Sequence, residues 1–211
     1  MAIRGVVFDV GGVLEITLDL GVVERWVDRL ELSPEQFRAQ TADIWADGGV
    51  GTMTERQVHH ALATRLGLTE ELQNEMMAEL WQQYLGTPNT ELIDYAHRLR
   101  DGYRTGILSN SFVGAREREQ AAYGLTDLVD VTIYSHEVGV AKPDPHIYSL
   151  ICKHLRVQPA EIVSSTTSRL ASRLLVKLGS KQSSTKTTTR PSRHRDILDY
   201  PLKDRRADIA L

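Results

Sequence analysis

The stretch Val6-Val7-Phe8-Asp9-Val10-Gly11-Gly12-Val13-Leu14 decides the fold of this chain. It continues an apolar, β-branched run that starts at Ile3, and Gly11-Gly12 breaks that run. The pattern predicts a short buried strand that ends in a tight turn. Asp9 then stands at the carboxyl end of the strand, where ligands bind in open α/β sheets. An aspartate there either attacks phosphorus as a nucleophile or caps the turn that follows it.

A helical pattern occupies the chain from about residue 19 to about residue 101. Apolar residues recur on one helical face from Val22 to Leu30. Two capping boxes, Ser33-Pro34-Glu35-Gln36 and Thr54-Glu55-Arg56-Gln57, each predict the start of a helix. We expect Thr69 to cap a further helix, and another helix to run from about Thr90 to Arg100.

Strands and helices alternate after this helical region. We expect strands at 105–109, 131–134 and 160–163, with helices at about 114–123 and 145–155 between them. Strands separated by helices of this length form a parallel α/β sheet. The predicted fold is therefore a Rossmann-like parallel sheet with an inserted all-α cap. The expected division is an α/β core at 1–17 and 89–179, a helical cap at 18–88, and an irregular basic tail at 180–211.

The composition of the 211 residues is that of a soluble globular protein, with 41% hydrophobic and 25% charged residues. No apolar run approaches the roughly 18 residues of a membrane span, and no signal peptide is visible before the first strand. Cys152 is the single cysteine, which excludes an internal disulfide and any zinc site built on several thiolates. These features predict a cytoplasmic protein that does not bind membranes.

The formal net charge of −3 conceals two oppositely charged parts. Residues 1–163 hold 14 basic and 24 acidic residues, whereas residues 164–211 hold 11 basic residues and 4 aspartates. The second part contains no glutamate, and 14 of its 48 residues are Ser or Thr. A single domain rarely changes composition so sharply, so the boundary near residue 164 needs its own explanation.

Two polar residues farther along the chain join Asp9 as candidates for chemistry. Ser109 ends the second strand of the predicted sheet, so parallel packing brings it near Asp9. Its hydroxyl and the N–H groups after it can hold a phosphoryl oxygen, although an ordinary strand-to-helix turn has the same pattern. Lys142 lies in a proline-flanked loop at 139–145, where a lysine either provides a point charge for a phosphate or faces solvent.

The order of these motifs resembles that of the haloacid dehalogenase-like hydrolase superfamily. Three stretches carry the similarity, which extends over residues 3–163: residues 6–14, Ile107-Leu108-Ser109-Asn110, and residues 135–148 with Lys142-Pro143-Asp144-Pro145. The helical insertion looks like the small α-helical cap of the phosphatase-rich branch. Within it, residues 45–54 are similar to a glycine turn between cap helices of that branch.

The resemblance implies a role for each matching residue. Asp9 would be the nucleophile and a Mg²⁺ ligand, and Gly11 would give its backbone carbonyl to the same ion. Ser109 would bind the phosphoryl group with Asn110 beside it, and Lys142 would neutralise the nucleophile and the transferred group.

Gly11 and Gly12 would complete the substrate site, because glycines let backbone N–H groups approach phosphate oxygens. The implied activity is Mg²⁺-dependent hydrolysis of a small phosphorylated metabolite through an aspartyl-phosphate. Positioning and charge neutralisation are what phosphoryl transfer requires.

The chain departs from the family pattern at two places. The usual phosphatase has a second aspartate two residues after the nucleophile, but Gly11 stands there and has no side-chain proton to give. General acid–base help contributes roughly 10²–10⁴-fold in rate. The family also places acidic metal ligands after the fourth strand, where this chain has Ser164-Ser165-Thr166-Thr167. Neutral hydroxyls are poor substitutes for carboxylates on a hard cation, so we expect this chain to bind Mg²⁺ weakly and its activity to be impaired.

One hypothesis explains both the lost acids and the change of composition. If residues 164–211 are read out of frame, one choice of codons gives a shifted peptide with the missing acidic pair, a helix and a last strand: LVDDVEARVEAAREAGIQAVVH. The nucleotide sequence across codons 155–211 tests this hypothesis. The alternative is a genuine basic tail that binds nucleic acid. We favour the first interpretation and expect no nucleic-acid partner, because a real tail does not explain the missing strand.

Two other functions remain open beside the phosphatase. A metal-independent 2-haloacid dehalogenase would use Asp9 on carbon, and Ser164-Ser165 faintly resembles the fourth motif of that branch. A bulky aromatic residue usually stands at the position of Gly11 in those enzymes, which argues against this function. A non-enzymatic pseudo-hydrolase would use the cap to bind a partner. Neither the substrate nor the oligomeric state follows from the sequence.

Overall fold

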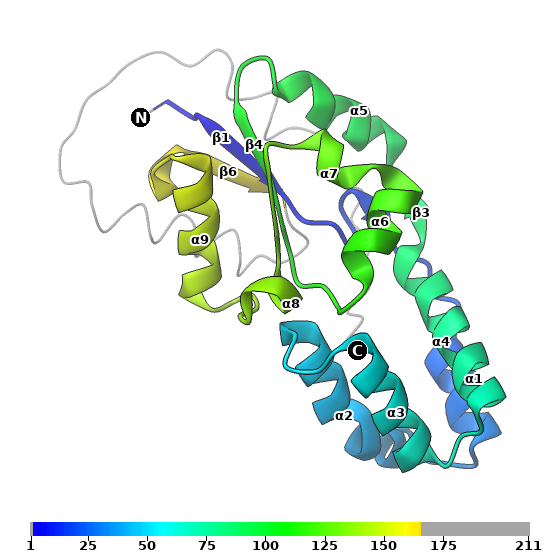
Figure 1. The fold of residues 1–211 in the computed structure, drawn as a ribbon. Helices are drawn as coiled ribbons and strands as arrows, with labels where there is room; N and C mark the ends of the chain where they lie inside the picture. The colour runs from blue at the N-terminus through cyan, green and yellow to red at the C-terminus, as the bar shows by residue number, and fades with distance from the viewer. Residues whose placement is uncertain (1, 166–211) are drawn as a thin grey trace.

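A computed structural model describes residues 2–165. Its centre is a four-stranded, all-parallel sheet in the order β5-β4-β1-β6 (Figure 1). The strands are β1 (Gly5–Phe8), β4 (Arg104–Ser109), β5 (Val131–Tyr134) and β6 (Ile162–Ser165). All four residues of β1 are buried, as an apolar run in the middle of a parallel sheet requires. The α/β fold with a Rossmann-like core is thus confirmed.

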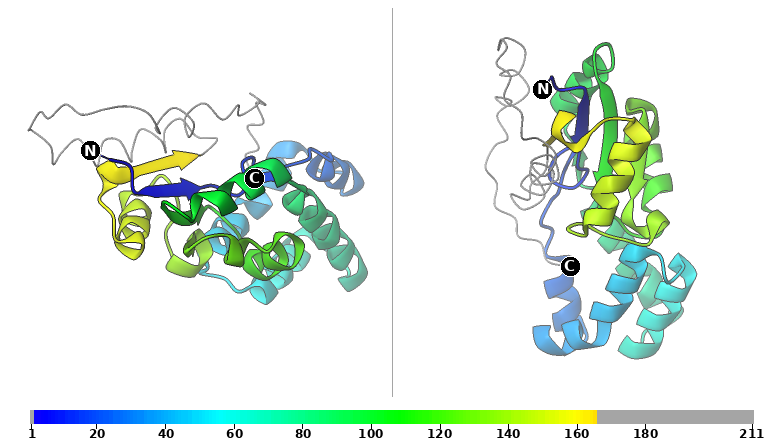
Figure 2. Two further views of the ribbon diagram at one scale, coloured as in Figure 1. Left: turned by 90° about the horizontal axis from the view of Figure 1, so that it is seen from above. Right: turned by 90° about the vertical axis from the view of Figure 1, so that its left-hand side faces the viewer.

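Helices cover both faces of the sheet (Figures 1 and 2). On one face lie α5 (Thr90–Leu99), α6 (Ala115–Tyr123) and α7 (Leu125–Leu128), which pack on Val6 and Phe8. The other face is covered by α9 (Pro145–Leu155), which packs on Val7 and Leu108. Cys152 is buried in this second cluster, as its apolar helix face predicts. Alternate residues of β1 therefore supply two separate cores.

A segment of four helices lies beyond the carboxyl ends of the strands (Figure 1). It consists of α1 (Val22–Arg29), α2 (Pro34–Val50), α3 (Glu55–Leu66) and α4 (Glu70–Leu85). These helices share a core of their own that includes Trp26 and Trp81. A two-stranded antiparallel ribbon of β2 (Glu15–Ile16) and β3 (Thr87–Pro88) joins the segment to the sheet.

The helix starts follow the capping chemistry of the sequence. Ser33 and Thr54 each accept a hydrogen bond from the backbone N–H three residues later, and both capping boxes are complete. Thr69 caps α4 through the N–H of Leu72. An unpaired N–H at a helix start is costly, so each cap stabilises its helix by about 1 kcal/mol.

Several elements differ from the sequence prediction. The glycine turn expected within residues 45–54 occupies only the end of the stretch, because α2 continues through Gly48 and Gly49 to Val50 and the chain turns at Gly51 before α3. The ribbon β2–β3, the short helices α7 and α8 (Ser135–Val138), and a 3₁₀ turn at Pro159–Glu161 were not expected. Elements of two to four residues are too short to leave a periodicity in the sequence.

Other predictions fall beyond the described residues. The end of the expected core segment 89–179, the basic tail and the pair Thr166-Thr167 all lie outside residues 2–165. Within residues 2–165, no helix is both long and apolar enough to cross a membrane.

Candidate active site

The sheet brings the candidate residues together at one edge. Phe8 pairs with Ile107, so Asp9 emerges beside the last residues of β4. Ser109 pairs with Tyr134, and Ser135 follows directly after β5. Parallel strands all end at the same edge, so polar residues that are far apart in sequence become neighbours.

Asp9 and Lys142 form the central charged pair of this edge. The ammonium Nζ of Lys142 donates to Oδ2 of Asp9 at 2.5 Å. Both side chains are largely buried, at 13% exposed for Asp9 and 12% for Lys142. Solvent therefore screens the pair little, and the charge-assisted hydrogen bond is of the strong class. The other carboxylate oxygen of Asp9 accepts the N–H of Val10 at 3.0 Å.

Residues at the end of β4 bond both the backbone and the side-chain ammonium of Lys142. Its Nζ also donates to the carbonyl of Leu108 at 3.0 Å. Its backbone N–H donates to Oδ1 of Asn110 at 2.7 Å, and its carbonyl accepts from Nδ2 of Asn110 at 2.9 Å. Asn110 thus contacts the backbone of Lys142 with both polar atoms of its amide.

Ser109 and the two glycines are at the same edge but make different contacts. Ser109 is 2% exposed, and its hydroxyl donates to the carbonyl of Asn110 at 3.4 Å. Gly12 has a φ of 69°, a conformation that favours glycine, and its N–H donates to Oε2 of Glu15 at 3.4 Å. The turn after β1 thus aims one of its backbone donors at a carboxyl group within the protein.

Glu15 is a buried residue beside the site that the sequence analysis missed. It is 2% exposed, and its Oε2 also accepts the hydroxyl of Thr17 at 2.7 Å. Its Oε1 is buried without a hydrogen-bond partner among the described residues. Burial raises the pKa of Glu15 to about 7. No sequence signal marked this glutamate. It follows the apolar residues Val13 and Leu14, where a polar residue is expected to face solvent.

A second buried carboxyl, Glu119, lies between the sheet and the helical segment. It accepts hydrogen bonds from the hydroxyls of Tyr134 in β5 and Tyr84 in α4, the latter at 3.1 Å. Burial also raises the pKa of Glu119. Three elements that are distant in sequence therefore meet at one acidic group.

The loop after Ser109 contacts the end of α2 directly. The hydroxyl of Ser135 accepts the N–H of Ser111 at 2.9 Å and donates to the carbonyl of Gly49 at 2.7 Å. Ser111 also bonds to Nδ1 of His136 at 2.6 Å, and burial lowers the pKa of that histidine. A side chain at Gly51 would lie 1.9 Å from the carbonyl oxygen of His136. The helical segment is thus seated on the same loops that carry the candidate site.

Oxygen donors for a cation are few in the described part of the site. Among residues 2–165, no three His, Cys, Asp or Glu side chains converge on a point that could hold a metal. Asp9 provides one carboxylate and Gly11 a backbone carbonyl, both of the hard oxygen type that Mg²⁺ takes. Because Mg²⁺ often completes its shell with water and substrate phosphate, this donor set fits the ion, although it is minimal.

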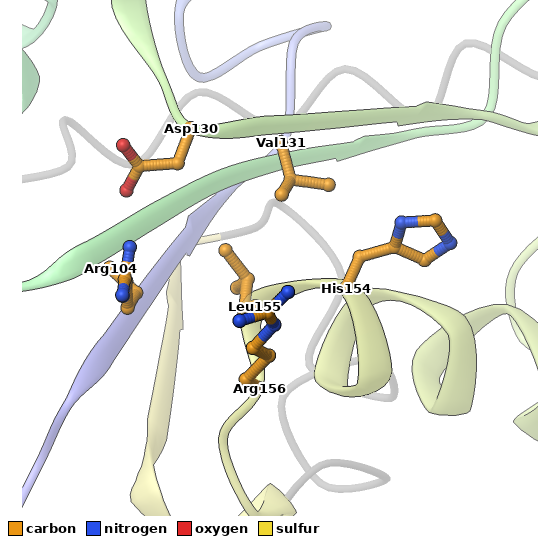
Figure 3. Close-up of a pocket in the computed structure, with 6 residues that line it drawn as sticks. All are labelled: Arg104, Asp130, Val131, His154, Leu155 and Arg156. Atoms are coloured by element: carbon orange, nitrogen blue, oxygen red, sulfur yellow. The ribbon is translucent and has the colours of Figure 1, made fainter.

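A cavity of about 310 Å³ lies elsewhere, at the amino-terminal edge of the strands (Figure 3). Arg104, Asp130, His154 and Arg156 line it, together with Val131 and Leu155. Arg104 starts β4 and Val131 starts β5, so this cavity lies at the opposite end of the strands from Asp9. It therefore does not belong to the candidate active site.

Comparisons with known proteins agree with this geometry. The profile of the haloacid dehalogenase-like hydrolase family matches residues 3–163. A phosphatase of Mycobacterium tuberculosis (strain CDC 1551 / Oshkosh) is 32% identical over 166 residues, which cover 74% of this chain and 75% of that protein. A pyrimidine 5'-nucleotidase of Escherichia coli (strain K12) is 27% identical over 118 residues, or 54% of this chain. The match spans about half of the nucleotidase, at 52% of its length.

A solved structure shares the fold. It is a HAD family enzyme from Bacteroides thetaiotaomicron in complex with magnesium and inorganic phosphate, with a TM-score of 0.72. The two sequences are 20% identical, and the match covers 84% of this chain and 91% of that chain. With the motifs, the parallel sheet and the family profile in agreement, this chain belongs to the haloacid dehalogenase-like hydrolases, and the protein is a hydrolase.

Proposed function

We propose that this hydrolase is a Mg²⁺-dependent phosphatase of a small phosphorylated metabolite and that Asp9 is its nucleophile. The ion pair of Asp9 with Lys142 carries the proposal, since it joins a nucleophile and a phosphate-neutralising charge at the carboxyl edge of the sheet. The phosphatase from M. tuberculosis supports the substrate class. The magnesium and phosphate in the B. thetaiotaomicron structure support the cofactor.

In the proposed reaction, an oxygen of Asp9 attacks phosphorus and the bond from phosphorus to the leaving oxygen breaks. Lys142 offsets the charge of the nucleophile and of the transferred group, and the hydroxyl of Ser109 binds a phosphoryl oxygen. Water then attacks phosphorus, the bond to Asp9 breaks, and inorganic phosphate leaves with the carboxylate restored. Gly11 has no side chain, so the proton for the leaving oxygen comes from water or from the substrate.

Asp9 and the carbonyl of Gly11 would hold Mg²⁺. When bound, the ion supplies a positive charge that stabilises the phosphoryl oxygens and orients the group for transfer. β6 ends in Ser164 and Ser165, whose hydroxyls are weak ligands for a hard cation. We therefore expect Mg²⁺ to be needed at a higher concentration than in a site with two or three carboxylates.

Hydrolysis of p-nitrophenyl phosphate at increasing Mg²⁺ tests this proposal. Asp9→Asn should lower kcat by at least roughly 10⁴-fold, because removal of a nucleophile disables the whole catalytic unit. Asp94→Asn, on the exposed side of α5, is the matched control and should keep full activity. Activity that survives in Asp9→Asn, or that does not respond to Mg²⁺ and chelator, would contradict the proposal.

The second candidate is hydrolysis of a 2-haloacid, in which Asp9 would attack carbon and expel halide. One observation favours it: β6 ends in two serines, and displacement at carbon needs no metal ligand there. Halide release from 2-chloropropionate in the presence of chelator separates the two functions. We favour the phosphatase because the M. tuberculosis relative is a phosphatase and because Gly11 stands where haloacid dehalogenases usually carry a bulky aromatic residue.

A further inference from the structure

Asn110 directly follows β4 and uses both polar atoms of its amide on one residue. Oδ1 accepts the N–H of Lys142 at 2.7 Å, and Nδ2 donates to the carbonyl of Lys142 at 2.9 Å. Two hydrogen bonds to the N–H and carbonyl of the same residue fix both its distance and its orientation, as a rung of a β-ladder does. The lysine backbone is thereby fastened to the end of a central strand, 32 residues away in the sequence.

The fixed backbone determines where the charge of Lys142 lies. A lysine side chain is flexible, and its ammonium is a point charge that reaches many positions unless the residue is anchored. Here Nζ reaches Oδ2 of Asp9 and the carbonyl of Leu108, at 2.5 and 3.0 Å. Leu108 and Asn110 belong to the same strand end, so β4 holds the lysine at its backbone and at its ammonium.

We propose that Asn110 is a positioning residue that acts on Asp9 through Lys142. This inference rests on the proposed function, since it gives Asn110 a part in the same reaction. It is distinct from the substrate-binding role that the family resemblance implies, because the two bonds run to the backbone of Lys142. Nδ2 carries two N–H groups and the bond to Lys142 uses one, so a positioning role and a substrate contact are compatible and have to be separated by experiment.

The first test measures the accessibility of Lys142 and needs no activity. The full chain is labelled with acetic anhydride, and peptide mass spectrometry gives the ratio of Lys142 to the exposed Lys153. Asn110→Ala should raise this ratio several-fold, because a loosened backbone lets Nζ leave Asp9 and Leu108. Asn74→Ala, on the exposed side of α4, is the matched control and should not change it. An unchanged ratio in Asn110→Ala would overturn the proposal.

The second test is a double-mutant cycle on phosphatase activity. Asn110→Ala should lower kcat roughly tenfold with KM nearly unchanged, and it should have almost no further effect in a Lys142→Met background. A raised KM, or a loss that persists in full without Lys142, would overturn the proposal in favour of direct substrate contact. If the unaltered chain hydrolyses no phosphomonoester, the proposed function fails, while the labelling ratio still decides the role of Asn110.

Discussion

Three largely buried carboxyl groups, those of Asp9, Glu15 and Glu119, lie near the turn after β1, and they differ in their hydrogen-bond partners. Asp9 meets the ammonium of Lys142. Glu15 and Glu119 are 2% and 1% exposed, and the hydrogen bonds that they accept among the described residues come from hydroxyls and a backbone N–H. Burial raises the pKa of both glutamates, that of Glu15 to about 7.

This comparison indicates that burial alone does not make a carboxyl group a good nucleophile. Burial favours the protonated form of these two glutamates, and the charge of Arg116 offsets this only in part at Glu119. A protonated carboxyl is a poor nucleophile but a good hydrogen-bonding group. The carboxylate of Asp9 instead bonds the ammonium of Lys142, whose charge is also placed to stabilise phosphoryl oxygens in the proposed reaction. The turn after β1 thus lies between the proposed nucleophile and two buried carboxyl groups to which we assign a role in packing.

Removal of the Lys142 ammonium, which distinguishes Asp9 from the two glutamates, is expected to have the largest effect. Lys142→Met should lower kcat for a phosphomonoester by roughly 10²–10³-fold, because Asp9 and the transferred group lose the charge that stabilises them. Lys153→Met in α9 is the matched control, since that side chain is exposed and carries no candidate role. Steady-state kinetics at saturating Mg²⁺ give the result, and equal activity in both variants would contradict the assignment of Lys142.

Substitution of Glu119 should lower the stability of the fold. Glu119→Ala leaves the buried hydroxyls of Tyr84 and Tyr134 without their acceptor and opens a cavity, so we expect a loss of about 2–4 kcal/mol in the free energy of unfolding. Glu119→Gln keeps an acceptor and should lose far less. Urea denaturation at pH 6 measures both variants. If they lost equal stability, the hydrogen bonds would not be the reason for this glutamate.

The raised pKa values predict how stability depends on pH. An unfolded glutamate releases its proton near pH 4.5, whereas folded Glu15 holds it to about pH 7. The native state therefore binds more protons between these values, and stability should fall as pH rises from about 5 to 8. For Glu15 the loss is on the order of 2–3 kcal/mol.

Glu15→Gln should flatten this decline, because the amide does not titrate. Glu91→Gln on the exposed side of α5 is the control and should leave the slope as it was. Denaturation midpoints in Mg²⁺-free buffers from pH 5 to 8 measure the effect. The same slope in both variants would show that Glu15 does not hold its proton in the fold.

An ion pair on the surface should give the smallest effect. Arg65 and Asp43 join α3 to α2 on the surface of the helical segment, where water surrounds both side chains. Arg65→Gln should leave the melting temperature almost unchanged, since exposed ion pairs contribute little and salt screens them further. A clear drop in the melting temperature of Arg65→Gln at low salt, absent at high salt, would show that this ion pair stabilises the fold more than its exposure indicates.

The sequence was sufficient for the parts of this fold that have strong local signals. β1, β4 and β5 are apolar runs bounded by polar or glycine positions, and the capping boxes at Ser33 and Thr54 mark helix starts chemically. Parallel strands then bring Asp9 to the edge where Ser109 ends its strand, whatever the register in detail. The glycine turn expected within 45–54 lies between α2 and α3, but it begins only at Gly51, because Gly48 and Gly49 stay helical.

The missing parts depend on contacts between distant residues. Nothing near Glu15 or Glu119 in the sequence indicates that either is buried, since burial comes from elements far along the chain. The bonds of Ser135 to Gly49 and Ser111 are of the same kind, because they join segments 86 and 24 residues apart. A single sequence gives residue types and local periodicity, and such pairings need the folded chain.

The close approach at Gly51 has a consequence for how related enzymes can diverge. Its φ of 73° and the nearby carbonyl of His136 leave no room for a side chain, so backbone meets backbone there. At this point the main chain sets the distance between α2 and α8, whereas nearby the side chain of Phe112 packs directly against Gly48. A substitution for Gly51 would have to move backbone, so we expect change among related enzymes at the side chains of these facing surfaces and not at position 51.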